Sequence, residues 1–202
     1  MKSKKKLMIA LLSLCVVVVA TIVTVVAVMA ATKTKFKGNV VVKYTATDVA
    51  GTVSANYKLN GTGEGVAFAG GTDGVLTIDA ELQNDVEVGT LAPASNITLT
   101  KDNRFVLFTF NFTNSGSRDY TATISYTDDK ADPNAEDANI IIEYSTDNTT
   151  FKASSDAQAP KSITVESGDE DAVYSFYIKV SIDKIAKDAE FSGSFSWDLQ
   201  AV

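Results

Sequence analysis

The chain has 202 residues, of which 45% are hydrophobic, and its 18 basic and 25 acidic side chains give a formal net charge of −7. It contains no histidine, and its one cysteine, Cys15, lies near the N-terminus. The rest of the chain therefore cannot form disulfides, cysteine or histidine metal sites, thiol nucleophiles or histidine-based triads. We expect neither an enzyme nor a cofactor-binding protein.

The N-terminal segment predicts export from the cytoplasm. Residues 1–6 contain four lysines, and residues 7–31 contain no charged side chain. A positive segment followed by an apolar one is typical of a secretory signal. Cys15 lies within the apolar run, after Leu14, where a lipoprotein signal has a small residue, so we interpret it as part of an apolar helix.

Two fates remain open for this segment. Val28 and Ala30 satisfy the small-residue rule for cleavage before Ala31, whereas an apolar run of this length would also span a bilayer as an anchor. In both cases the remainder is exported. We therefore expect a signal peptide or membrane anchor over residues 1–30, and a single secreted or cell-surface domain over residues 31–202.

The charge of the exported part argues against a nucleic-acid partner. Residues 1–30 hold four of the 18 basic residues and none of the 25 acidic ones, which leaves a net charge of 14 − 25 = −11. Phosphate binding requires a concentrated positive surface, which this sequence does not offer.

Beyond the signal, apolar and polar residues alternate with period two, which predicts half-buried strands. The glycine-rich residues 60–74 predict a flexible loop or an irregular hairpin, and residues 183–190 a short helical turn. About nine short strands are predicted, in the regions 39–49, 51–59, 74–82, 85–91, 106–127, 139–145, 162–167, 172–182 and 190–199.

Residues 106–127 carry the strongest pattern. Phenylalanines alternate with polar residues over 106–112, the sequence "TNSGSRD" follows, and a second alternating run begins at Tyr120. Two such runs around a short turn predict a β-hairpin with one buried and one wetter face.

Two aromatic residues are candidates for a sugar-binding platform. Trp197 shares one side of the strand 190–199 with other apolar residues, which favours a place in the core of an antiparallel sheet. Tyr177 lies on the more polar side of its strand, so we expect it to be exposed.

An acidic loop supplies the candidate metal ligands. Carboxylate and amide oxygens suit calcium, but the glycine-centred spacing of a calcium loop is missing, which favours a solvated loop. The same alternatives apply to residues 167–172. The candidates of the first loop are Asp128, Asp129, Asp132, Asn134, Glu136 and Asp137.

Short turn-rich intervals between strands, without a long second helix, predict an all-β fold. Aromatic side chains gathered on single faces suit two packed sheets. We expect an antiparallel β-sandwich, jelly-roll or immunoglobulin-like, after the N-terminal hydrophobic signal or anchor helix.

The segment "FVLFTFNFTNSGSRDYTATISYT" (105–127) resembles the strand, turn and strand of exported bacterial proteins related to the biofilm fibre subunit TasA and to camelysin. Residues 139–151 are similar to the strand that follows in that group, and residues 38–49 resemble the start of uncharacterised Gram-positive surface proteins. The resemblance implies a jelly-roll-like sandwich and a structural surface role. It also implies that subunits could join by donation of an N-terminal strand.

These observations together predict a non-enzymatic structural subunit of a surface or matrix fibre or coat. Residues 31–44 are the candidate donor strand, and the alternative is that they form the first strand of their own sheet. The rival function is a membrane-anchored adhesion or ligand-binding module for glycan or calcium.

Overall fold

A computed structural model describes residues 34–44, 49–79, 86–100, 102–129, 140–169, 171–182 and 190–202. The predicted cleavage residues Val28, Ala30 and Ala31 lie outside this part of the chain, as do residues 183–189 of the predicted helical turn. Within the ranges given, no helix is long and apolar enough to cross a membrane.

All regular structure in the described residues is β-strand, which confirms the predicted all-β class. The thirteen strands include ten that overlap the nine predicted regions, since 106–127 covers most of both β7 and β8, and three short ones, β3, β6 and β10, that were not recognised. Their bounds are β1 (Thr34–Tyr44), β2 (Gly51–Leu59), β3 (Val66–Ala69), β4 (Val75–Ile78), β5 (Val86–Pro93), β6 (Ile97–Leu99), β7 (Phe105–Asn114), β8 (Tyr120–Asp129), β9 (Ile140–Ser145), β10 (Lys152–Ala153), β11 (Ser162–Val165), β12 (Tyr174–Ile182) and β13 (Glu190–Ala201).

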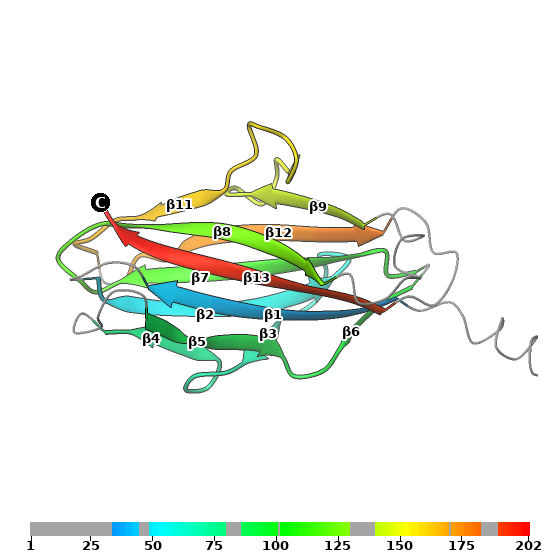
Figure 1. Ribbon diagram of the computed structural model, residues 1–202, viewed down its shortest axis with the longest axis horizontal. Helices are drawn as coiled ribbons and strands as arrows, with labels where there is room; N and C mark the ends of the chain where they lie inside the picture. The colour runs from blue at the N-terminus through cyan, green and yellow to red at the C-terminus, as the bar shows by residue number, and fades with distance from the viewer. Residues whose placement is uncertain are drawn as a thin grey trace, which may run out of the picture.

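The strands form one curled mixed sheet, a half-barrel, in the order β10-β9-β12-β7-β2-β3-β5-β1-β13-β8-β11, with β4 beside β2 and β6 beside β1. Strand β3 joins the two halves of the sheet, because it pairs with β2 and also with β5. In Figure 1, strands β1, β13 and β8, here called the front half, pass before β2, β7 and β12, the back half.

Strand β1 is an interior strand of this sheet. It pairs in parallel with β13, from Lys35 beside Glu190 to Tyr44 beside Leu199, and antiparallel with β5 on its other edge. Within one chain, the N-terminal strand thus belongs to its own sheet, which is one of the two arrangements left open by the sequence. Strand β13 has its expected antiparallel partner in β8, but its second neighbour is parallel.

The predicted hairpin over residues 106–127 is wrong. Strand β7 pairs with β2 and β12 in the back half, whereas β8 pairs with β13 and β11 in the front half. The chain crosses from one half to the other between them. The alternating pattern identifies which face of each strand is apolar. Both apolar faces are also buried when the two strands lie in different halves of a sheet around one core, so the pattern does not require the two strands to pair.

Hydrogen bonds hold this crossing in place. The buried Asn114 donates from Nδ2 to the carbonyl oxygens of Arg118 (2.8 Å) and Val165 (3.2 Å), and its Oδ1 accepts from the Gly116 N–H (2.9 Å). Tyr120 donates from its hydroxyl to the Thr113 carbonyl oxygen at 2.9 Å. These bonds satisfy backbone groups of the connecting segment, of the end of β7 and of β11.

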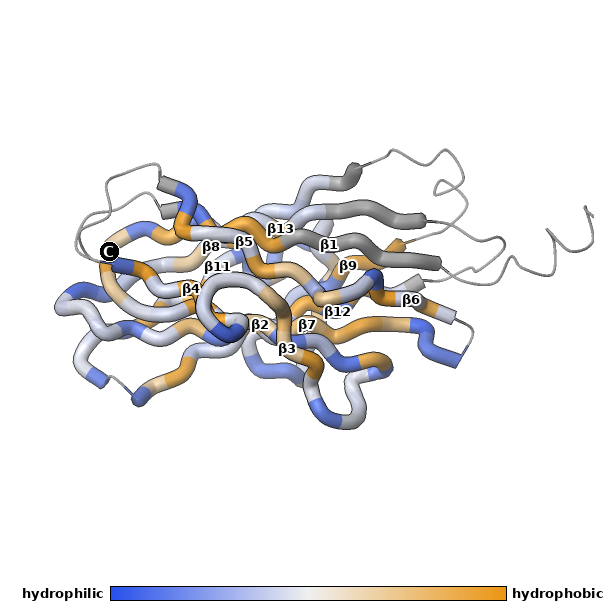
Figure 2. Tube along the Cα trace, turned by 90° about the horizontal axis from the view of Figure 1, so that it is seen from below, coloured by the Kyte–Doolittle hydropathy of each residue, from blue (hydrophilic) through white to orange (hydrophobic). Residues whose placement is uncertain are grey.

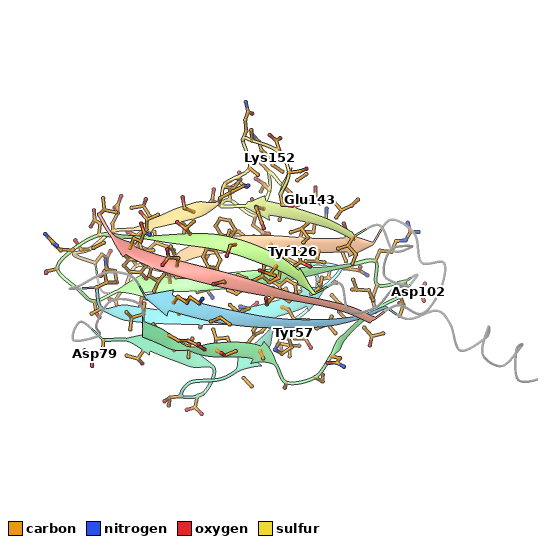
Figure 3. The ribbon with its side chains drawn as sticks, viewed as in Figure 1. Tyr57, Asp79, Asp102, Tyr126, Glu143 and Lys152 are labelled. Carbon is orange, nitrogen blue, oxygen red and sulfur yellow. The ribbon has the colours of Figure 1, made fainter. Side chains whose placement is uncertain are left out.

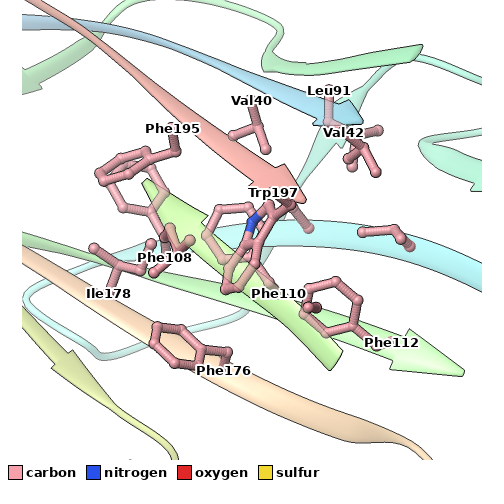
Figure 4. Close-up of a cluster of buried hydrophobic side chains, with 14 of the residues drawn as sticks. Val40, Val42, Leu91, Phe108, Phe110, Phe112, Phe176, Ile178, Phe195 and Trp197 are labelled. Carbon is pink, nitrogen blue, oxygen red and sulfur yellow. The ribbon is translucent and has the colours of Figure 1, made fainter. Parts of the chain in front are cut away.

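An aromatic core fills the space between the halves (Figure 4). The Trp197 ring of β13 lies 5.3 Å from the Phe110 ring, 5.0 Å from the Phe112 ring and 5.1 Å from the Phe176 ring, measured between centroids. Trp197 itself is fully buried, as its sequence context predicts. Figure 2 shows the most hydrophilic positions mainly at the turns that join the strands.

Candidate functional site

The outer face of the back half carries a groove of about 570 Å³. Strands β2, β7 and β12 form its floor, and the glycine-rich segment before β3 and the loop after β9 contribute to its walls. Its lining side chains are mostly amides, hydroxyls and one aromatic ring, together with a single cation. The lining residues are Asn56, Lys58, Gly61, Gly65, Ala67, Leu107, Thr109, Asn111, Asn148, Ser175 and Tyr177.

The period of two along each strand selects the residues of the floor. In β7, the residues Val106, Phe108, Phe110 and Phe112 turn inward and are at most 1% exposed. The residues between them therefore face outward into the groove. The pattern had correctly assigned both faces of this strand.

Strand pairing brings three polar side chains onto one rung of the floor. Thr109 lies at the centre, with Asn56 of β2 as its partner on one side and Tyr177 of β12 on the other. One rung further along, Asn111 faces Ser175, whose hydroxyl donates to the Asn111 Oδ1 at 2.8 Å. The floor is thus a polar lattice across three strands.

Several of these groups have no partner among the residues that the structure describes. Among the described residues, the side chains of Asn56, Lys58, Thr109 and Tyr177 make no hydrogen bond or ion pair. Their donors and acceptors are half-buried and remain available to water or to a ligand.

The second lysine of this face is engaged. Lys179 Nζ lies 2.8 Å from Glu143 Oε2 and 5.4 Å and 5.6 Å from the ring centroids of Phe105 and Phe151. Glu143 belongs to β9, toward the edge of the sheet (Figure 3). The Glu143 carboxylate is therefore paired with Lys179, and none of the described residues that line the groove carries a carboxylate.

An aspartate turn builds the rim beside Asn148. Asp147 Oδ1 accepts hydrogen bonds from the N–H groups of Thr149 and Thr150 and from the Ser145 hydroxyl, each at 2.8 Å. These bonds hold the pKa of the Asp147 carboxyl well below its ordinary value. They also fix the turn in which Asn148 adopts a φ of 59°, a conformation that asparagine tolerates.

A second aspartate, Asp119, connects the segment between β7 and β8 to the residues after β11 by hydrogen bonds. The Asp119 carboxylate accepts from the N–H of Ser167 at 2.7 Å and from its hydroxyl at 2.8 Å. The backbone bond and then the hydroxyl bond lower the pKa of Asp119. Neither Asp119 nor Ser167 is among the groove residues given above, so this aspartate stabilises the fold locally.

The side chains of the predicted metal ligands lie outside the part of the chain that the structure describes, so this site stays a prediction. Asp132, Asn134, Glu136 and Asp137 lie outside the described residues, and the side chains of Asp128 and Asp129 at the end of β8 do as well. Elsewhere in the described ranges, no group of three acidic, cysteine or histidine side chains could hold a metal ion. In the second acidic loop, the Asp169 side chain accepts the N–H of Asp171 at 3.2 Å, and the Asp169 backbone oxygen accepts the N–H of Ala172 at 3.1 Å.

Of the two aromatic candidates, only Tyr177 reaches the surface site, as expected. The other groove residues were missed, because their convergence depends on the neighbourhood of β2, β7 and β12, whose positions in the chain are far apart. The available signal was the amide and hydroxyl content of the outward positions in these strands.

The arrangement is suited to binding by hydrogen bonds and ring contact. Comparison with known proteins adds no assignment: no family model matches the chain, and no curated protein is significantly similar to it.

Proposed function

We propose that this protein is an exported, non-enzymatic structural subunit of a cell-surface or extracellular-matrix fibre or coat. It would be secreted, or held at the membrane by residues 1–30. The observation that carries the proposal is the position of β1, a terminal strand that lies inside the sheet with a partner on each edge.

A strand in this position is suited to exchange between chains. Val40 and Val42 of β1 are buried at 1% and 0% exposure, so the sheet needs their side chains. The buried side chains of β1 could also come from another chain, because an identical strand from a neighbour would restore every contact in the same register. Repeated exchange in one direction would join subunits end to end.

The proposal also includes the way in which the sheet is layered. We infer that the front and back halves act as the two layers of a jelly-roll-like sandwich. Ring contacts such as Phe108 with Phe195, at 5.9 Å between centroids, support this inference because they link the inner faces of both halves.

The test uses a disulfide between β1 and β13. Val41 and Ser196 are register partners, and their neighbours in each strand point into the core, so both face outward. The full-length variant Val41→Cys/Ser196→Cys, with Cys15→Ala, would be exported by a bacterial host and oxidised. Strand donation predicts a ladder of covalent multimers on a non-reducing gel, and fibres by negative-stain electron microscopy.

The single variant Val41→Cys in the same background is the control, because it can form at most one random dimer. Size-exclusion chromatography with light scattering should show large assemblies of the unmodified chain. A double variant that forms only an internal disulfide, in a protein that stays monomeric at high concentration, would exclude strand donation as the mode of assembly.

A further inference from the structure

We propose that the groove on the outer face of β2, β7 and β12 is a binding site for a neutral glycan chain. The proposal goes beyond the structural role and does not depend on strand donation. It rests on three properties of the described groove residues: unused hydrogen-bonding groups, the absence of carboxylates, and an outward aromatic ring.

The groove amide of Asn56 differs from the structural amides of the same chain. Asn60 donates to the Asp102 carbonyl oxygen and to Asn103, and Asn114 makes three bonds at the chain crossing. Asn56 makes none with the described residues. A half-buried amide that plays no part in the fold is a ready partner for the hydroxyl groups of a sugar.

The charges of the groove and of the whole chain favour an uncharged glycan over an acidic one. The chain has 25 acidic and 18 basic residues, yet among the described residues of the groove lining Lys58 is the only charged one. A neutral glycan avoids the repulsion that an acidic polymer would meet from a protein with a net charge of −7. The ammonium group of Lys58 can donate to hydroxyl or acetamido oxygens of a neutral sugar.

The shape of the groove fits a short stretch of such a chain. A volume of about 570 Å³ lies within the range of small-molecule binding sites. Tyr177 offers an apolar ring and a hydroxyl tip, which suits the mixed faces of a sugar ring. The hydrogen-bonded Asp147 turn keeps the rim at Asn148 in place, which lowers the entropic cost of binding.

Affinity electrophoresis of the full-length chain in non-ionic detergent tests the proposal. Native gels would contain hydroxyethylcellulose, galactomannan or soluble starch as neutral probes, and polygalacturonate as the acidic probe. We expect retardation by at least one neutral polysaccharide. The variants Tyr177→Ala and Asn56→Ala should each raise the dissociation constant at least tenfold.

The matched control is Thr123→Ala, which removes an exposed hydroxyl from β8 on the front half. It should bind as the unmodified chain does. The melting temperature of each variant verifies folding, and Asn56→Ala carries the test if Tyr177→Ala does not fold. The proposal is overturned by no retardation in any neutral gel, by retardation in polygalacturonate alone, or by unchanged binding in folded groove variants.

Discussion

The two faces of β7 serve different purposes on the same backbone. The inner face, from Val106 to Phe112, lies against Trp197 and Phe195 of the front half and is almost completely buried. The outer face presents Thr109 and a neighbouring asparagine to the groove. The comparison teaches that stability and surface chemistry are encoded at alternate positions of one strand, so each can be changed separately.

The largest effect on the free energy of unfolding is expected from a substitution on the inner face of β7. Phe110→Ala removes a ring that lies 5.3 Å from Trp197 and 6.3 Å from Phe68, and it leaves a cavity. We expect a loss of about 3–5 kcal/mol in the free energy of unfolding. Urea titration measures it through the fluorescence of the single tryptophan. A loss below about 1 kcal/mol would mean that the core relaxes around the site.

A substitution at the end of the inner face of β7 should have the next largest effect on the free energy of unfolding. Asn114→Ala removes three hydrogen bonds and leaves the buried Val165 carbonyl oxygen without that partner. The expected cost is about 1–3 kcal/mol by urea titration. Asn96→Ala, at an exposed position before β6, is the control and should unfold as the unmodified chain does.

Acid should weaken the link between the chain crossing and β11. Because the folded-state pKa of Asp119 is lowered, the stability it contributes is complete above the ordinary carboxyl pKa and is lost as the pH falls below about 4. Asp119→Asn should therefore show a flatter decline of the free energy of unfolding between pH 5 and pH 3 than the unmodified chain.

Asp102→Asn is the control for that experiment, since its side chain accepts no hydrogen bond from the described residues (Figure 3). Its decline with pH should match that of the unmodified chain. An unchanged slope for Asp119→Asn would show that the Ser167 bonds do not contribute to acid stability.

The smallest effect on the free energy of unfolding is expected from a substitution on the outer face of β7. Thr109→Val keeps the β-branched shape and removes a hydroxyl that has no partner in the described residues. The free energy of unfolding should stay within about 0.5 kcal/mol of the original. A destabilisation as large as that of Phe110→Ala would contradict the division between the two faces.

The sequence predicted individual strands better than their partners. The bounds of β2 match the predicted region 51–59, and the inward set of β7 matches the predicted apolar face. Short strands such as β3 and β10 contain too few residues for a period to appear. The hairpin prediction failed because alternation says which face is apolar and leaves the identity of the neighbouring strand open.

The groove could not be predicted for a related reason. Its floor joins Asn56, Thr109 and Tyr177, which are far apart in the chain and meet only through the pairing of β2, β7 and β12. Tyr177 was recognised as an outward aromatic residue, but nothing local linked it to the two polar partners. The side chains of the acidic loop lie outside the described residues, so the metal site suggested by its composition stays a prediction.

By itself, the sequence determined the all-β class, the inward position of Trp197 and the outward position of Tyr177, because the alternation of side chains is a local property of extended backbone. Only the tertiary structure decided that β1 lies parallel to β13 and that β7 and β8 lie in different halves of the sheet. Backbone hydrogen-bonding groups are the same in every strand, so the choice of partner depends on how all the apolar faces pack together.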